Sequence, residues 1–139
     1  MGHRAFAERF YHEWNCGNME AVYDMLAPDI VDHAASEGEA GREGVRQVLD
    51  TVRRAFPDHH YTVEDVISEG DKFAVRLTAT GTHLGDFFGI PPTGRHATWT
   101  ETRIVRVVDG KVVDHWANTD SLGMLRQLGV LPEPGRANW

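Results

Sequence analysis

Two neighbouring polar residues, Asp114 and His115 in the run KVVDHWANTD, are of types that could carry acid–base chemistry. The run is rich in Val and follows the turn signal DG, so it is expected to be a β-strand. Successive side chains of a strand point to opposite faces of the sheet, and only one of the two can therefore face an interior. An imidazole or carboxylate held in a cavity can remove a proton from an acidic carbon, so the direction of each side chain decides the chemistry.

The preceding strand-like run, HATWTETRIVR, separates its side chains into two chemically different sets. One set contains Trp99, Glu101 and Arg103, whereas the alternate positions carry mainly Thr. A strand face with Trp, Glu and Arg together is typical of a ligand-binding cavity, but a buried ion pair or a subunit interface would show the same pattern. If the face lines a cavity, Glu101 could act as a general base, since burial beside Trp99 raises a carboxylate pKa while Arg103 lowers it.

A third group, Asp32 and His33 in LAPDIVDH, again places two ionisable residues side by side. The segment 30–34 is a short strand candidate, so one of the two side chains must face inward. The two residues could form an acid/base pair, or they could only fix the loop that follows.

Composition excludes several classes of function. The 139 residues carry a formal net charge of −7 without a run of Lys or Arg, so nucleic acid is not an expected partner. The single cysteine, Cys16, cannot form an intramolecular disulfide or a cysteine zinc cluster. The eight histidines lack ligand-like spacing, and His59 and His60 follow a Pro-Asp turn where solvated side chains are usual, so no metal site is predicted. No stretch is long and apolar enough to span a bilayer, which predicts a cytoplasmic protein without membrane contacts.

The order of periodic segments predicts an α+β fold in a single domain covering residues 1–139. Apolar residues at helical spacing predict helices over 4–14, 19–26 and 42–56, with Asn18 as the cap of the second. Strand-like runs occupy 61–70, 71–85, 96–110 and 111–118, before a final helix over 121–129 that Asp120 can cap. The tail from about residue 132 looks irregular. Helices followed by a strand meander indicate helices packed on one face of a curved antiparallel sheet.

The run GTHLGDFFGIPPTGRHATWTETRIVRVVDGKVVDHWANTDSLGMLRQLG strongly resembles the SnoaL-like polyketide cyclases, or ester cyclases, of the nuclear-transport-factor-like superfamily. FYHEWNCGN, LAPDIVDH and RRAFPDHHYTVEDVISEGDKFAVR extend the resemblance over nearly the whole chain. It implies a cone-shaped, curved mixed sheet around a central pocket that N-terminal helices cover, commonly in a homodimer or homotetramer. The implied reaction is aldol-type ring closure of an apolar, carbonyl-bearing polyketide ester by acid–base chemistry, without metal or cofactor.

The resemblance also implies which side chains face the pocket. The family's catalytic Asp lies two residues after the His of the DH pair, and that position is Ala117, which cannot accept a proton. His115 shares the parity of Ala117 and is expected to face inward, as a catalytic group or as a buried histidine that only hydrogen-bonds a neighbour. Asp114 is then expected to face outward, where it can pair with Arg106 or lie at a subunit contact. The catalytic candidates are therefore Glu101, His115, Asp32 and His33. The residues expected to contact substrate are Trp14, Trp99, Arg103, His83 and Phe88, although His83 could instead orient the loop FFGIPPTG.

The loss of the family's Asp leaves two other functions open. A non-catalytic protein could bind the same kind of small molecule, or the pocket could host epoxide hydrolysis, hydration or cofactor-free hydroxylation. A further expectation concerns assembly. An outward sheet face with Thr100, Thr102, Ile104 and Trp116 would expose an aromatic side chain in a monomer, which predicts a homodimer or larger assembly.

Overall fold

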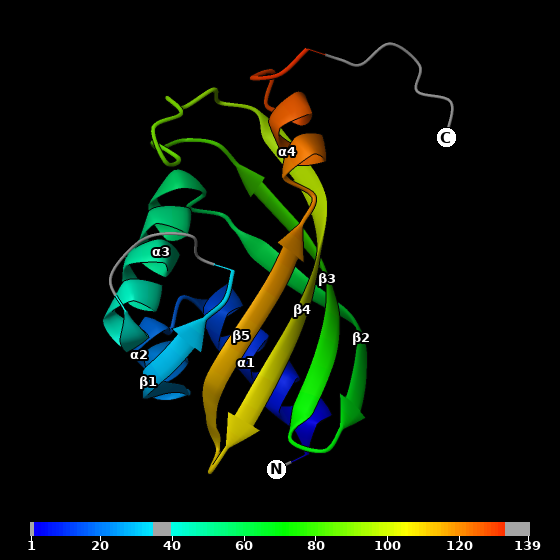
Figure 1. The fold of residues 1–139 in the computed structure, drawn as a ribbon. Helices are drawn as coiled ribbons and strands as arrows, with labels where there is room; N and C mark the ends of the chain where they lie inside the picture. Colours follow the sequence, from blue (N-terminus) through cyan, green and yellow to red (C-terminus); the bar gives the residue numbers. More distant parts are fainter. Residues whose placement is uncertain (1, 35–39, 133–139) are drawn as a thin grey trace.

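The fold is a curved five-stranded sheet with helices against its concave side and one helix at its end (Figure 1). The computed structural model describes residues 2–34 and 40–132. The strands are β1 (Leu26–Asp32), β2 (His60–Glu69), β3 (Lys72–Thr82), β4 (His96–Val108) and β5 (Lys111–Thr119). Their order across the sheet is β1-β5-β4-β3-β2. The predicted α+β class and the mixed sheet implied by the family resemblance are both confirmed.

The edge strand β1 makes the sheet mixed, because it pairs with β5 in parallel while the other neighbouring strands are antiparallel. The predicted boundary at residue 30 is wrong, since β1 starts at Leu26 and includes Pro28. Proline is tolerated there because one side of an edge strand donates no ladder hydrogen bonds. The parallel pairing brings Asp32, at the end of β1, next to His115.

The helices are α1 (His3–Cys16), α2 (Met19–Asp24), α3 (Gly41–Ala55) and α4 (Ser121–Gln127). α1 ends at Cys16, two residues beyond the predicted segment, because Gly17 adopts the left-handed conformation with φ of 76°. Asn18 precedes α2, but the predicted capping contact is wrong, because its side-chain amide donates to Glu13 Oε2 at 2.8 Å instead. The cap of α4 is confirmed, since Asp120 Oδ1 accepts a hydrogen bond from the backbone N–H of Gly123 at 3.0 Å.

Two helices face the concave side of the sheet and enclose the interior. α1 packs mainly along β2, and α3 packs along β1. Two aromatic side chains of α1 are buried, with Tyr11 and Trp14 only 3% and 1% exposed. α3 is less well covered, because Val45, Leu49 and Val52 are partly buried and form part of a cavity wall. The interior is therefore hollow between α1, α3 and the sheet.

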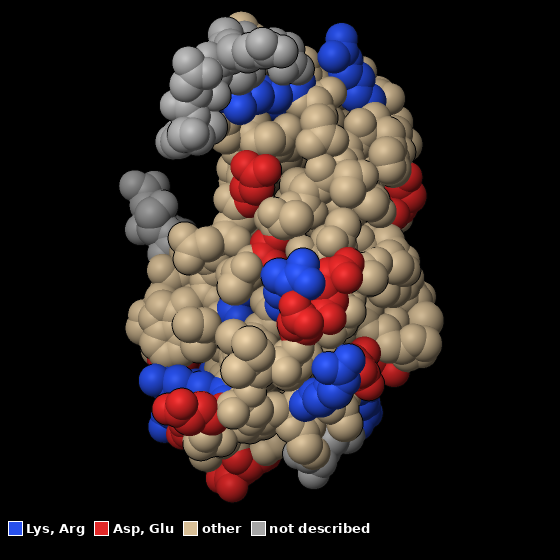
Figure 2. Space-filling model, turned by 90° about the vertical axis from the view of Figure 1, so that its right-hand side faces the viewer, with Lys and Arg blue, Asp and Glu red and all other residues tan. Residues whose placement is uncertain are grey.

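The outer surface is charged but mixed in sign. Figure 2 shows Lys and Arg lying beside Asp and Glu over one face of the molecule. Exposed ion pairs of this kind include Arg76 with Asp65 at 2.7 Å and Arg4 with Glu8 at 3.0 Å. Within residues 2–34 and 40–132, no helix has the length and apolar character needed to cross a membrane. Apart from Pro132, the tail predicted to be irregular lies outside the described residues.

The chain after β3 packs closely on the C-terminal end of α3. The backbone N–H groups of Leu84 and Gly85 both donate to the carbonyl oxygen of Ala55, at 2.9 and 3.2 Å. A Cβ atom on Gly85 would lie only 2.4 Å from the carbonyl oxygen of Arg54. This contact ties the loop that follows β3 to α3.

Gly85→Ala is expected to lower the free energy of unfolding by about 1–3 kcal/mol, because backbone atoms must move to admit the new methyl group. Urea denaturation followed by circular dichroism measures the change. Gly2→Ala is the matched control, since its Cβ would meet no atom within 4 Å. Equal stability of Gly85→Ala and the wild type would show that the loop is not held against α3.

Candidate functional site

Two adjoining hollows lie against the sheet. α1 and α3 contribute to the wall of the smaller one, and α3, α4 and the loop after β3 contribute to the wall of the larger one. The larger has a volume of about 500 Å³ and contains most of the ionisable side chains. The smaller, of about 120 Å³, is mainly apolar, with walls that include Phe10 from α1 and Leu49 from α3. Among the described residues, no three His, Cys, Asp or Glu side chains are grouped to hold a metal ion. The polar residues that line both hollows are Asp32, Tyr61, Arg103 and His115.

Strand β4 turns its predicted face inward. Trp99 and Glu101 are only 5% and 6% exposed, and both line the larger hollow together with Arg103. The alternate residues are exposed: Thr98, Thr100 and Thr102. The direction predicted for this strand is therefore confirmed, while the catalytic and binding roles of its residues stay predictions.

Glu101 and Arg103 form a buried ion pair. Arg103 Nη2 donates to Glu101 Oε1 at 2.7 Å, and Trp99 Nε1 donates to the other carboxylate oxygen at 2.9 Å. Burial alone would raise the pKa of Glu101, but the charge of Arg103 and these hydrogen bonds outweigh burial and hold the pKa below its usual value. Glu101 is therefore an ionised carboxylate with both oxygens engaged, which makes it a weak proton acceptor.

Arg103 also joins two tyrosines from different elements. Its Nη1 donates to Tyr11 Oη of α1 at 3.3 Å, and its Nη2 donates to Tyr61 Oη of β2 at 2.6 Å. Burial raises the pKa of both phenols, although the positive charge of Arg103 opposes the effect. Both hydroxyls therefore keep their protons while accepting from Arg103, and each retains an O–H that can donate to a ligand.

Asp32 and His115 form a second polar pair. His115 Nδ1 lies 3.0 Å from Asp32 Oδ1, which also accepts a hydrogen bond from the backbone N–H of Ala34 at 3.0 Å. Burial alone would raise the pKa of Asp32, but the interaction with His115 and the Ala34 hydrogen bond lower it. Since an ionised carboxylate only accepts, the ring of His115 in its neutral form carries its proton on Nδ1 and keeps a lone pair on Nε2. That Nε2 is buried and has no hydrogen-bond partner among the described residues.

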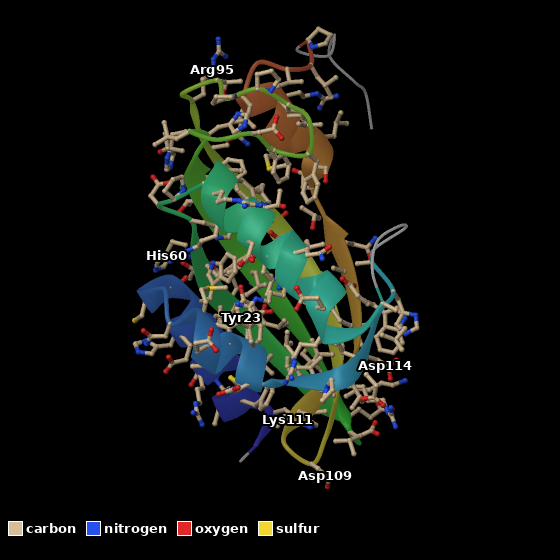
Figure 3. The ribbon with its side chains drawn as sticks, turned by 90° about the vertical axis from the view of Figure 1, so that its left-hand side faces the viewer. Tyr23, His60, Arg95, Asp109, Lys111 and Asp114 are labelled. Atoms are coloured by element: carbon tan, nitrogen blue, oxygen red, sulfur yellow. The ribbon has the colours of Figure 1, made fainter. Side chains whose placement is uncertain are left out.

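A bulge in β5 turns His115 toward the interior. The pairing of β5 with β4 shifts at Val113, which is the extra residue of the bulge. Val112 and His115 therefore both line the smaller hollow, although they are three residues apart. Asp114 faces outward and bonds Arg106 at 3.0 Å, which confirms the predicted pair. Figure 3 shows Asp114 on the side of the molecule away from α1 and α2.

His33 lines neither hollow. Its Nε2 lies 2.9 Å from Asp114 Oδ1, and its ring stacks on Trp116 with ring centroids 4.5 Å apart. The hypothesis that Asp32 and His33 form the acid/base pair is therefore wrong, because adjacent side chains at the end of a strand point to opposite faces. Asp32 pairs instead with His115, which is 83 residues away in sequence.

His59 is a cavity residue that sequence reasoning missed. It is only 3% exposed, it lines the larger hollow, and its Nδ1 accepts a hydrogen bond from Trp14 Nε1 at 2.9 Å. The expectation that His59 and His60 are both solvated is correct for His60 and wrong for His59. His59 and Tyr61 are both buried on either side of the exposed His60. This alternation at the start of β2 was the signal available in the sequence.

The loop after β3 holds the last two predicted site residues. His83 is fully buried, its Nδ1 accepts a hydrogen bond from the backbone N–H of Thr93 at 3.2 Å, and it is not among the described residues that line the hollows. This position matches the predicted role in orienting the loop and not the predicted substrate contact. Phe88 is 60% exposed with a φ of 47°, and it lines the larger hollow together with Phe87.

Comparison with known proteins relates this geometry to one family. A model of the family described as SnoaL-like polyketide cyclase matches residues 5–128. The nogalonic acid methyl ester cyclase of Streptomyces nogalater is 33% identical over 129 residues, which are 91% of this chain and 96% of that protein. AclR of Streptomyces galilaeus, a candidate hydroxylase, superimposes with a TM-score of 0.84 at 32% identity over 96% of this chain and 84% of its own. IdmH of Streptomyces antibioticus, a candidate polyketide cyclase, superimposes with a TM-score of 0.78 at 38% identity over 91% of this chain and 98% of its own.

The burial of His59 makes stability depend on pH. Burial, with the charges of Arg103 and Arg53, lowers the pKa of His59 to about 4, although Glu101 opposes the effect. Below the ordinary pKa of about 6.5, the unfolded chain gains a proton at this position and the folded protein does not. The contribution of His59 is therefore present above pH 6.5 and is lost progressively as the pH falls toward 4.

Between pH 7 and pH 5, the free energy of unfolding of the wild type is expected to fall by about 2 kcal/mol more than that of His59→Gln. Urea denaturation at the two pH values measures this difference in pH dependence, separately from any loss of stability at pH 7. His60→Gln is the control, because His60 is exposed and should leave the pH dependence unchanged. The same pH dependence in His59→Gln and wild type would contradict a neutral buried His59.

Proposed function

Since the chain belongs to the SnoaL-like polyketide cyclase family, we propose that it is a cytoplasmic, cofactor-independent cyclase that closes a ring in a polyketide ester by an aldol-type reaction. The observation that carries this proposal is the pair of Asp32 and His115. The carboxylate orients the imidazole, and the second ring nitrogen has no partner among the described residues. His115 lines a cavity of about 500 Å³. This is the arrangement that a general base requires.

His115 Nε2 is the proposed base. It takes a proton from the carbon between or next to carbonyl groups, and the electron pair of the broken C–H bond forms an enolate. Asp32 stabilises the imidazolium that results. The enolate carbon attacks a second carbonyl carbon of the same molecule, and His115 returns the proton to the new alkoxide. The C–H bond and the π bond of the attacked carbonyl are broken, and one C–C bond and one O–H bond form, so the reaction is a redox-neutral isomerisation.

Glu101 is assigned a supporting role in this proposal. Its low pKa and its two hydrogen bonds favour a fixed counter-charge for Arg103 over a proton acceptor. Arg103 in turn holds Tyr11 and Tyr61, whose free O–H groups can donate to oxygen atoms of the substrate. The family's catalytic Asp is absent here, since its position is Ala117. In this proposal His115, from the same strand, takes over its role as the base.

The two hollows suit a ligand with separate apolar and oxygenated parts. The smaller hollow, of about 120 Å³, is similar in size to a cavity of about 150 Å³ that admits benzene. It could take a ring or a short alkyl group while the carbonyl groups lie beside His115. The methyl ester of nogalonic acid, from which the relative in Streptomyces nogalater takes its name, is the first substrate to test.

His115→Gln is expected to lower kcat on such an ester by a factor of about 10² to 10⁴, because glutamine can bond Asp32 but has no basic nitrogen. Asp32→Asn should lower kcat as well, since the amide no longer fixes the tautomer of His115. His33→Gln is the matched control, because His33 lies on the outer face, and it should keep turnover within about two-fold. Steady-state kinetics with product analysis measures all three variants.

Two outcomes would contradict the assignment. Full turnover in His115→Gln with loss of turnover in Glu101→Gln would make Glu101 the base. A wild-type protein that binds the ester without turning it over, and gains activity in Ala117→Asp, would instead be a non-catalytic binding protein. Ala117 lines the larger hollow, so the new carboxylate would reach the ligand.

We also propose that the protein assembles as a homodimer through the outer face of the sheet. A row of apolar side chains crosses four strands there, because the strand register aligns Ile67, Ala74, Ile104 and Trp116. Ile67 and Ile104 are 72% and 44% exposed in the single chain. An exposed apolar row of this kind favours contact with a second copy.

Ile104→Glu is expected to convert the protein from a dimer to a monomer, because it places a charge at the centre of the apolar row. Sedimentation equilibrium at micromolar concentration distinguishes twice the chain mass of 15.6 kDa from the chain mass itself. Leu122→Glu, at a residue of α4 that is 50% exposed, is the control and should stay dimeric. A monomeric wild type would contradict the proposed assembly.

A further inference from the structure

The tautomer of His59 is fixed by its contact with Trp14. The indole Nε1–H can only donate, and it donates to His59 Nδ1 at 2.9 Å. Both side chains are buried, at 1% and 3% exposure, so water does not compete for this hydrogen bond. In the neutral ring the accepting nitrogen carries no hydrogen, and the single ring proton of His59 is therefore on Nε2.

The Nε2–H of His59 is a buried donor without an acceptor. None of the described residues accepts a hydrogen bond from it. A buried donor without a partner is unfavourable, so its presence calls for an explanation. His83 Nε2 is also unpaired, but His83 is not among the described residues that line the hollows, whereas His59 lines the larger one.

The surroundings of His59 keep it a neutral donor. Its ring lies edge-on to Tyr61 and Trp99, with centroids 4.4 and 5.6 Å away. Burial lowers the pKa of His59 to about 4, so the imidazole is uncharged at neutral pH. A neutral imidazole can polarise a carbonyl group without giving up its proton.

His59 and His115 therefore carry opposite groups on their unpaired Nε2 atoms. Trp14 donates to His59 and leaves an N–H on Nε2, whereas Asp32 accepts from His115 and leaves a lone pair on Nε2. Both residues line the larger hollow with Arg103. A molecule in that hollow that has an acidic C–H next to a carbonyl group needs one group of each kind.

We propose that His59 is a catalytic residue that forms a carbonyl-oxygen subsite, in which its Nε2–H donates to the substrate oxygen that becomes the enolate oxygen. The catalytic role of His59 rests on the proposed cyclase function, whereas the binding of a ligand oxygen by His59 does not. When His115 removes the proton from carbon, the electron pair moves to this oxygen and the hydrogen bond from His59 becomes stronger. No proton leaves His59, so the ring is unchanged at the end of each turnover.

The subsite is tested first by binding, with 4-nitrophenol as the probe. Its phenolate is a stable analogue of an enolate oxygen, and nitrobenzene is the matched ligand without that oxygen. Loss of one hydrogen bond to a charged oxygen should weaken phenolate binding by about 10- to 100-fold in His59→Leu. Nitrobenzene binding should change by less than about three-fold, and His60→Leu, at the exposed neighbour, should bind both ligands as the wild type does. Absorbance titration above the pKa of the phenol measures the affinities.

A measurement on the wild type avoids dependence on the folding of the variant. Nitrogen-15 NMR of the histidine rings should show the Nε2–H tautomer for His59 and a downfield shift of that proton when the phenolate binds. An Nδ1–H tautomer, no shift on binding, no phenolate binding at millimolar concentration, or equal loss of both ligands in His59→Leu would each overturn the subsite.

Measurements of turnover distinguish failure of the role of His59 from failure of the proposed cyclase function. His59→Leu should lower kcat on the polyketide ester by about 10²-fold, as expected for one lost oxyanion donor, with a smaller effect on KM. If the phenolate results hold and the wild type cyclises no ester, the subsite stands and the cyclase proposal fails. If the wild type cyclises the ester and His59→Leu keeps full kcat, cyclisation stands and the role of His59 fails.

Discussion

The buried guanidinium of Arg103 is the group on which the rest of the interior depends. A charge removed from water is strongly unfavourable unless it is paired and hydrogen-bonded. The partners of Arg103 come from three elements, with Glu101 on the same strand, Tyr11 on α1 and Tyr61 on β2. Helix and sheet are therefore held together around a polar centre, and Arg103 lines both hollows.

The chemistry available around that centre is decided by what the neighbours of each histidine can donate or accept. An indole can only donate and an ionised carboxylate can only accept, so Trp14 and Asp32 fix opposite tautomers in His59 and His115. Side chains that are fixed in this way need no reorganisation when a ligand arrives. The family fold supplies the hollow, and these contacts, more than the fold, determine what reaction it can support.

Strand alternation separates the two sides of the sheet. Trp99, Glu101 and Arg103 face the hollows, while Ile104 and Trp116 face outward. His33 and Asp114 belong to the outer side, where they bond each other, although each is next to a residue of the inner pair. The same two strands can therefore serve ligand chemistry on one side and association on the other.

Most helices and strands of this protein, and the faces of its regular strands, could be predicted from sequence alone. The helical spacing in α1, the alternation in β4 and the cap at Asp120 all depend on residues close in sequence, so they could be predicted locally. The family resemblance added the cone-shaped sheet and the inward direction of His115. Tertiary structure decided the pairs that define the site. Asp32 meets His115 only because β1 pairs in parallel with β5, and Trp14 meets His59 only because α1 lies along β2. The bulge at Val113 arises from packing between distant segments, which no local pattern records.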